Sequence, residues 1–115
     1  MTYSVIASAA KQSMDPLEKI LQLLVKALRA PLERKETVDE FHSCFFDNEQ
    51  VLERSIGEGA YQVLADLSWD LNFFVANPVW RMQDPSYYGD ERLGEEIKEA
   101  LRRLSQLGIA VPDGL

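Results

Sequence analysis

The sequence is poor in the residues that most often carry chemistry, with one cysteine and one histidine in 115 positions. A lone cysteine, Cys44, cannot form a disulfide within the chain, which excludes the disulfide frameworks of small secreted domains. His42 lies two positions before Cys44, and side chains two apart do not share a face of a helix. A catalytic Cys/His pair is therefore not expected.

The patterns of metal and phosphate sites are also missing from the sequence. It has no glycine-rich phosphate loop, and the acidic residues near position 90 do not follow the spacing of a calcium loop. Glu95, Glu96 and Glu99 lack the histidine of the Glu-x-x-His motif of di-iron proteins, and the helix dipole explains acids at a helix start. We expect a protein that is not an enzyme and that holds no metal and no cofactor.

Long apolar runs are absent, since charged residues interrupt every apolar stretch well before the roughly 20 residues that a membrane-spanning helix needs. The segment from Tyr3 to Ala10 has no basic residue in front of it, unlike a signal peptide. The first lysine of the chain, Lys11, comes after the segment. These features predict a cytoplasmic protein without membrane contact. Residues 1–14 are interpreted as a leader, with a weak strand pattern from Tyr3 to Ile6.

Basic residues are outnumbered by acidic ones, 12 against 19, for a net charge of -7. A nucleic-acid-binding surface needs a surplus of lysine and arginine, so direct binding to nucleic acid is not expected. Residues 36–99 contain 15 acidic and four basic side chains, whereas residues 1–35 are net positive. This distribution predicts a negative field over the middle of the chain and a cationic partner.

The first half of the chain contains two segments with the apolar spacing of amphipathic helices. One begins at Asp15-Pro16, with Asp15 as N-cap and Glu18 completing a capping box, and ends before Pro31. The second begins with Thr37 as N-cap and ends either at Asn48 or near Ser55, before two glycines. Its expected buried residues are Val38, Phe41, Phe45 and Leu52.

The second half contains two more such segments, separated by a loop. A third helix is predicted from about Glu58 to Ala76, a loop from Val79 to Gly89, and a fourth helix from Asp90 to a stop at Gly108. Residues 109–115 form a short tail. Four amphipathic helices with short connections predict an all-α fold, an antiparallel four-helix bundle, as a single domain over residues 1–115.

Aromatic and acidic residues are interleaved where the third predicted helix leads into the fourth. Aromatic side chains anchor protein interfaces, and acids steer and orient a basic partner. The alternative is that the acids form ordinary solvated faces and that Trp80 and one tyrosine fold over the end of the bundle. The candidate partner-binding residues are Asp66, Trp69, Asp70, Asp84, Tyr87, Tyr88, Asp90, Glu91 and Glu95.

The order of features over residues 15–107 resembles the colicin D-type immunity proteins, a family that includes the cognates of contact-dependent inhibition toxins. The matching features are an amphipathic first helix, a short basic link, a helix with Glu40-Phe41 near its start, a third helix rich in leucine and aromatics, Asn77-Pro78, Asp84-Pro85, the run Tyr87-Tyr88-Gly89-Asp90-Glu91-x-Leu93 and a closing amphipathic helix.

The resemblance implies a small acidic four-helix bundle that occupies the active site of a cationic nuclease toxin, commonly one that cuts tRNA. Carboxylates would stand where RNA phosphates lie. The matching positions on this chain are Asp84, Tyr87, Tyr88, Asp90, Glu91 and Glu95, with Asp70 nearby. The loop has two tyrosines and a tryptophan where a denser acidic run is expected, so its contacts are predicted to be more aromatic.

Two functions of different classes follow from the sequence. The first is an immunity protein, monomeric when free, whose partner is a basic nuclease toxin domain. The second is a helical adaptor or regulatory subunit that uses a Trp69/Phe73 stripe for homodimerisation or for docking a partner helix.

Overall fold

The computed structural model describes residues 15–112, so the predicted leader 1–14, its weak strand pattern and residues 113–115 lie outside the described part. The described chain is all-α, as the sequence predicts. Its elements are α2 (Pro16–Arg29), η1 (Pro31–Glu33), α3 (Arg34–Asp47), α4 (Glu49–Asp70), η2 (Leu71–Phe73), α5 (Pro78–Arg81) and α6 (Asp90–Gln106), where η marks a 3-10 turn.

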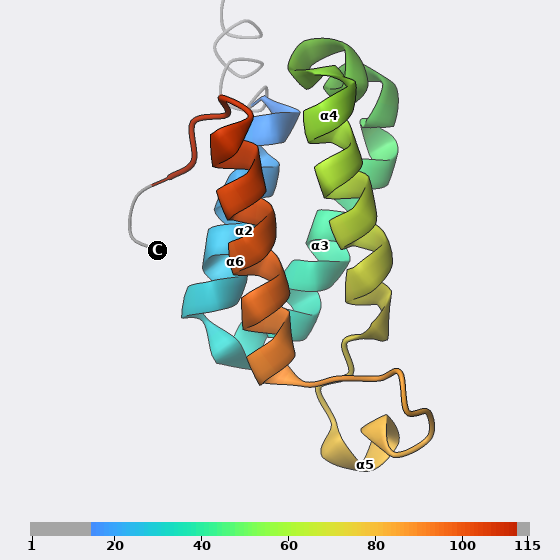
Figure 1. Ribbon diagram of the computed structural model, residues 1–115. Helices are drawn as coiled ribbons and strands as arrows, with labels where there is room; N and C mark the ends of the chain where they lie inside the picture. The colour runs from blue at the N-terminus through green and yellow to red at the C-terminus, as the bar shows by residue number, and fades with distance from the viewer. Residues whose placement is uncertain (1–14, 113–115) are drawn as a thin grey trace, which may run out of the picture.

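The long helices pack in two main pairs, α2 with α3 and α4 with α6. In Figure 1, α2 runs downward, α3 returns, the first stretch of α4 continues to the upper end, the stretch of α4 after Gly57 runs downward and α6 returns. The lower end of the molecule in this view therefore gathers the end of α4, the start of α6 and the turn between α2 and α3. The segment that contains α5 projects beyond this end (Figure 1), which we call the α5 end.

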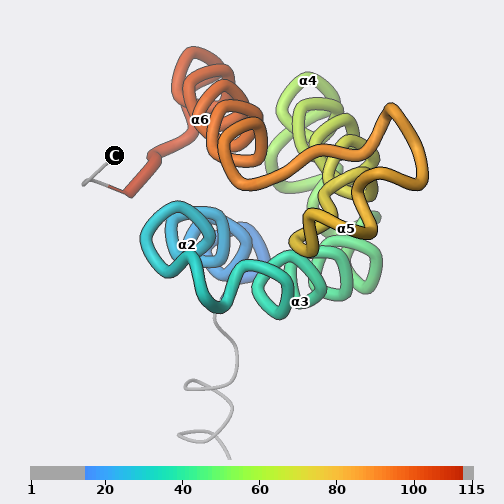
Figure 2. The backbone as a smooth tube through the Cα atoms, turned by 90° about the horizontal axis from the view of Figure 1, so that it is seen from below, coloured from blue at the N-terminus to red at the C-terminus, as the bar shows by residue number. Residues whose placement is uncertain are grey.

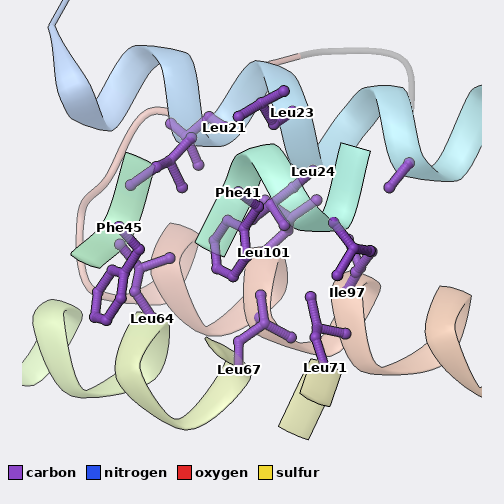
Figure 3. Close-up of a cluster of buried hydrophobic side chains, with 14 of the residues drawn as sticks. Leu21, Leu23, Leu24, Phe41, Phe45, Leu64, Leu67, Leu71, Ile97 and Leu101 are labelled. Carbon is purple, nitrogen blue, oxygen red and sulfur yellow. The ribbon is translucent and has the colours of Figure 1, made fainter. Parts of the chain in front are cut away.

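Apolar side chains from all four long helices meet in one core. Figure 3 shows Leu21, Leu23 and Leu24 of α2 facing Phe41 and Phe45 of α3, Leu64 and Leu67 of α4, and Ile97 and Leu101 of α6. Burial of one leucine or phenylalanine side chain contributes about 1.5–3 kcal/mol. The periodic stripes read from the sequence supply nearly all of these residues, including the predicted Val38, Phe41, Phe45 and Leu52.

Asp15 is the N-cap residue of α2, as predicted, whereas the predicted N-cap Thr37 is wrong. The Asp15 side chain makes no capping hydrogen bond to α2, although α2 does begin at Pro16. Thr37 lies inside α3, where its buried hydroxyl donates to the Glu33 carbonyl oxygen at 2.8 Å. The reason is that Pro31 starts the turn η1, which leads directly into α3. The helix therefore begins at Arg34, three residues before Thr37.

Of the two predicted ends of the second helix, the structure has the one at Asn48, and the glycines interrupt the next helix instead. The backbone N–H of Asn48 bonds to the Phe45 carbonyl, which ends α3, and α4 begins at Glu49. Gly57 then interrupts α4 with φ 88° and ψ 163°. Only glycine adopts this backbone conformation without strain, so the residue marks a kink between two helical stretches.

The predicted extension of the third helix to Ala76 is wrong, because α4 ends at Asp70 and η2 at Phe73. The backbone of Phe74 is extended and forms an isolated β-bridge with Tyr88. The expected loop is also partly helical, since Asn77 caps the single turn α5. At the other end of the chain, α6 begins at Asp90 and stops before Gly108, which has φ 91°, as predicted.

Candidate protein-binding surface

The connection from η2 to α6 is closed at its base by backbone hydrogen bonds. Val75 N–H donates to the Tyr88 carbonyl and Tyr88 N–H donates to the Phe73 carbonyl, both at 2.9 Å. The chain therefore leaves the helical core and re-enters it at the same place. The intervening residues form a projecting loop with a fixed base, visible below the long helices in Figure 1.

Tyr88 fastens this loop to α4. Its side chain is buried, and its hydroxyl donates to the Asp70 carbonyl at 2.8 Å and lies 3.2 Å from Asp70 Oδ2. The Arg92 guanidinium lies 4.8 Å from the ring centre. Burial, and then the neighbouring Asp70 carboxylate, raise the pKa of the Tyr88 hydroxyl. The structure thus places Tyr88 inside the molecule, where it holds the loop to α4, and not on the exposed part of the α5 end.

Asp70 is also engaged within the molecule. Arg92 Nη2 lies 3.9 Å from Asp70 Oδ1, and Arg92 Nε lies 3.4 Å from Glu96 Oε2. Partial burial, and then the negative charge of Asp70, raise the pKa of the Glu96 carboxyl. This cluster connects α4 to α6, so Asp70 acts mainly between helices.

Asp90 connects the start of α6 to the turn between α2 and α3. Its carboxylate lies 3.0 Å from Arg34 Nη1, and Arg34 Nε donates to the Ala27 carbonyl at 2.7 Å. The Asp90 side chain is still 54% exposed. It contributes negative charge at the α5 end, but part of that charge is already compensated by Arg34.

The remaining candidate acids face solvent. Asp84 accepts hydrogen bonds from both the N–H and the hydroxyl of Ser86, at 2.8 and 2.7 Å, and these bonds lower the pKa of its carboxyl. Glu91 and Glu95 are exposed, and no ion pair to them is present within residues 15–112. Asp66 is exposed and accepts a hydrogen bond from Gln62. The Asp84 carboxylate is therefore held in place by hydrogen bonds. The negative charges of Glu91 and Glu95 are not balanced by an ion pair within this part of the chain.

The aromatic candidates differ in their exposure. Trp69 is 68% exposed and meets Phe73 edge to face, with ring centres 5.8 Å apart. Tyr87 is half-buried. In the alternative interpretation, Trp80 and one tyrosine were expected to cover the end of the core. Tyr88 does so, whereas Trp80 remains 58% exposed.

Two apolar residues of this surface were missed in the sequence, Val79 and Met82. They are 68% and 84% exposed and flank Trp80 in and after α5. The sequence signal for them is the helix start Asn77-Pro78, because Asn is a favoured N-cap and proline a favoured first residue. A one-turn helix there places Val79, Trp80 and Met82 on a short rigid element rather than in an irregular loop.

His42 and Cys44 have structural surroundings. His42 Nε2 lies 2.8 Å from the Ser68 carbonyl oxygen, which links α3 to α4. Partial burial raises the pKa of the Cys44 thiol, which disfavours the reactive thiolate. Within residues 15–112, no three His, Cys, Asp or Glu side chains converge as a metal site would require.

The chain has no match among family models, curated proteins or solved structures. Among the helices of residues 15–112, none combines the length and the apolar character needed to cross a membrane. Functional inference therefore depends on the surface at the α5 end.

Proposed function

We propose that this chain is an immunity protein that binds a cognate basic nuclease toxin domain, of the kind that cuts tRNA, and blocks its active-site cleft. In this proposal the long helices form an antiparallel four-helix bundle that supports the α5 end. The protein acts in the cytoplasm by occupancy alone, as a non-enzyme without a cofactor. The observation that carries the proposal is that Asp84, in the projecting loop, and Glu91 and Glu95, in the first turns of α6, are exposed, and that the same loop carries the exposed Trp80.

Charge complementarity gives the physical reason. A nuclease cleft that attracts a polyanion is lined with lysine and arginine, so an acidic protein surface is drawn to it and competes with RNA for the same residues. Asp84 is suited to this role because its two hydrogen bonds from Ser86 hold the exposed carboxylate in one orientation. A preorganised anion avoids part of the entropy cost of binding.

The test replaces Asp84, Glu91 and Glu95 together by lysine. Asp90 is left unchanged, because a lysine facing Arg34 would destabilise the protein and obscure the result. A cognate toxin is expected to be encoded next to this chain, and its basic C-terminal domain is expressed in cells with each variant. We expect loss of growth protection and loss of inhibition of tRNA cleavage, with helicity by circular dichroism unchanged.

A matched control reverses three exposed acids far from this surface, Glu18, Glu53 and Glu58. The change in net charge is the same as in the test variant, so the control separates local complementarity from the total charge. It should keep protection. Full protection by the Asp84, Glu91 and Glu95 variant would contradict the proposal.

One observation favours the second candidate function. Trp69 exposes a large aromatic surface on α4, next to Phe73. A helical adaptor that dimerises or docks a partner helix through this stripe would bury it. The oligomeric state of the free protein distinguishes the two functions.

A further inference from the structure

Three large apolar side chains project from the α5 end and contribute little to the core. We call Val79, Trp80 and Met82 the α5 knob; they are 68%, 58% and 84% exposed. Figure 2, which views the molecule from this end, shows α5 on the side of α3 and α4. Grouped exposed apolar residues on a small charged protein are typical of a binding surface, and tryptophan is enriched among the residues that dominate binding energy.

The knob is held in a defined conformation. Asn77 Oδ1 accepts hydrogen bonds from Val79 N–H at 2.8 Å and from Trp80 N–H at 3.4 Å, which caps α5. Arg81 Nη2 donates to the Ala76 carbonyl at 3.2 Å, across the base of the same turn. A flexible loop would lose conformational entropy on binding, whereas this turn is already ordered.

Gly89 contributes to this order through its lack of a side chain. A Cβ at this position would overlap the Arg81 guanidinium, so the flexible end of Arg81 would have to move. The Arg81 guanidinium therefore packs directly on the backbone where the loop re-enters α6. This contact connects the knob to the helical core independently of the hydrogen bonds at the loop base.

Charge decides what kind of surface can cover the knob. Asp84 lies in the same loop, and Glu91 and Glu95 lie in the first turns of α6. Two copies of the chain, each with a net charge of -7, repel each other, and Asp84 lies in the loop that a second copy docked on the knob would approach. Like charges facing each other across an interface are unfavourable, whereas lysine and arginine around an apolar pocket would complement both features.

We infer that the α5 knob is the anchor of the complex, with Trp80 inserting into an apolar pocket of the nuclease domain whose rim carries lysine and arginine. This inference rests on the proposed function and adds to it. The acids speed association and set the orientation, and the knob slows dissociation. The two contributions respond differently to salt, because ions screen exposed charges but not apolar burial.

The experiment measures binding of the purified nuclease domain to the full chain by calorimetry at low and high salt. Trp80→Ser is expected to raise Kd by about 30-fold or more at both salt concentrations, the size of effect found for interface anchors. The salt dependence of Kd should stay as in the wild type. Asp84→Asn combined with Glu91→Gln should instead reduce the salt dependence.

Leu107→Ser is the matched control, because Leu107 is a 53% exposed apolar residue just after the far end of α6. Its Kd is expected to equal that of the wild type. Met82→Ser provides a second knob variant in case Trp80→Ser lowers the folded fraction, which circular dichroism measures. At 84% exposure, Met82 contributes little to folding.

The outcomes separate the two proposals. Wild-type affinity in both knob variants would overturn the inference while leaving the immunity function in place. Absence of any binding by the wild-type chain would overturn the proposed function and the inference with it. A large loss in both knob variants at both salt concentrations, together with an unchanged Leu107→Ser, would support the anchor.

Discussion

Tyr87 and Tyr88 are neighbours in the chain but have opposite environments. Tyr88 is buried against Phe74 and donates its hydroxyl to Asp70, whereas Tyr87 is half-buried. Sequence reasoning assigned the same role to both, because a loop without periodicity gives no indication of which side chain points inward. The backbone pairing between Phe74 and Tyr88 decides it, since that pairing turns Tyr88 toward the core.

Removal of the Tyr88 hydroxyl should destabilise the protein. In Tyr88→Phe, the two Asp70 oxygens lose their partner at a buried site, so we expect the free energy of unfolding to fall by about 1 kcal/mol in urea titrations. Tyr87→Phe is the matched control and should change stability by a few tenths of a kcal/mol at most. Equal effects of the two substitutions would contradict the structural role of Tyr88.

The same variant gives a prediction for pH. The pKa of Tyr88 is raised above its ordinary value of 10.0 in the folded state, so the neutral hydroxyl is preferred there. Its contribution to stability is fully present below pH 10 and is lost as the pH rises toward the folded-state pKa. The stability difference between wild type and Tyr88→Phe should therefore be constant from pH 6 to 9 and shrink above pH 10.

At the scale of the element, two different causes shape α4. A local feature of the sequence produces its kink, and a contact between residues far apart in the chain sets its end. The kink at Gly57 is a local effect, and the sequence indicates it through its two glycines. The end of α4 at Asp70 is different, because Leu71 to Ala76 continue an apolar pattern compatible with a helix. Pairing with the backbone at Tyr88 extends Phe74 and so removes this segment from the helix.

Gly57 and Gly59 lie two positions apart and allow a direct test of the kink. Gly57→Ala places a Cβ on a backbone with φ 88° and should cost about 1–3 kcal/mol. Gly59→Ala, within the helical stretch after the kink, meets Leu107 only at an ordinary 3.9 Å and should gain up to about 1 kcal/mol from helix propensity. Thermal unfolding of both variants measures the signs, and a stabilising Gly57→Ala would contradict the kink.

At the scale of the whole molecule, charge and shape are combined at one end. Residues 36–99 carry most of the acidic surplus, and the direction of the helices brings the end of α4, the α5 loop and the start of α6 together. The same arrangement pairs Asp90 with Arg34 and Asp70 with Arg92. Of the candidate acids, Asp84, Glu91 and Glu95 are exposed and take part in none of these ion pairs.

The free protein should be a monomer of 13.1 kDa in sedimentation equilibrium at moderate salt. Self-association through the α5 end would oppose like charges, and raising the salt should not produce a tight dimer. A symmetric dimer with Trp69 protected from a quencher of its fluorescence would instead favour the adaptor function. Trp69→Ser distinguishes the cases, because it would dissociate such a dimer and leave a monomer unchanged.

The sequence by itself determined the all-α class, the apolar stripes of the core and the boundaries of α2 and α6, because helix periodicity, proline and glycine act over a few residues. It also determined the sign of the charge in the middle of the chain. Only the tertiary structure decided which acids are paired, which tyrosine is buried and that Val79, Trp80 and Met82 are exposed. Those features depend on contacts between residues far apart in the chain, such as Asp90 with Arg34 and Tyr88 with Asp70, and no local pattern specifies them.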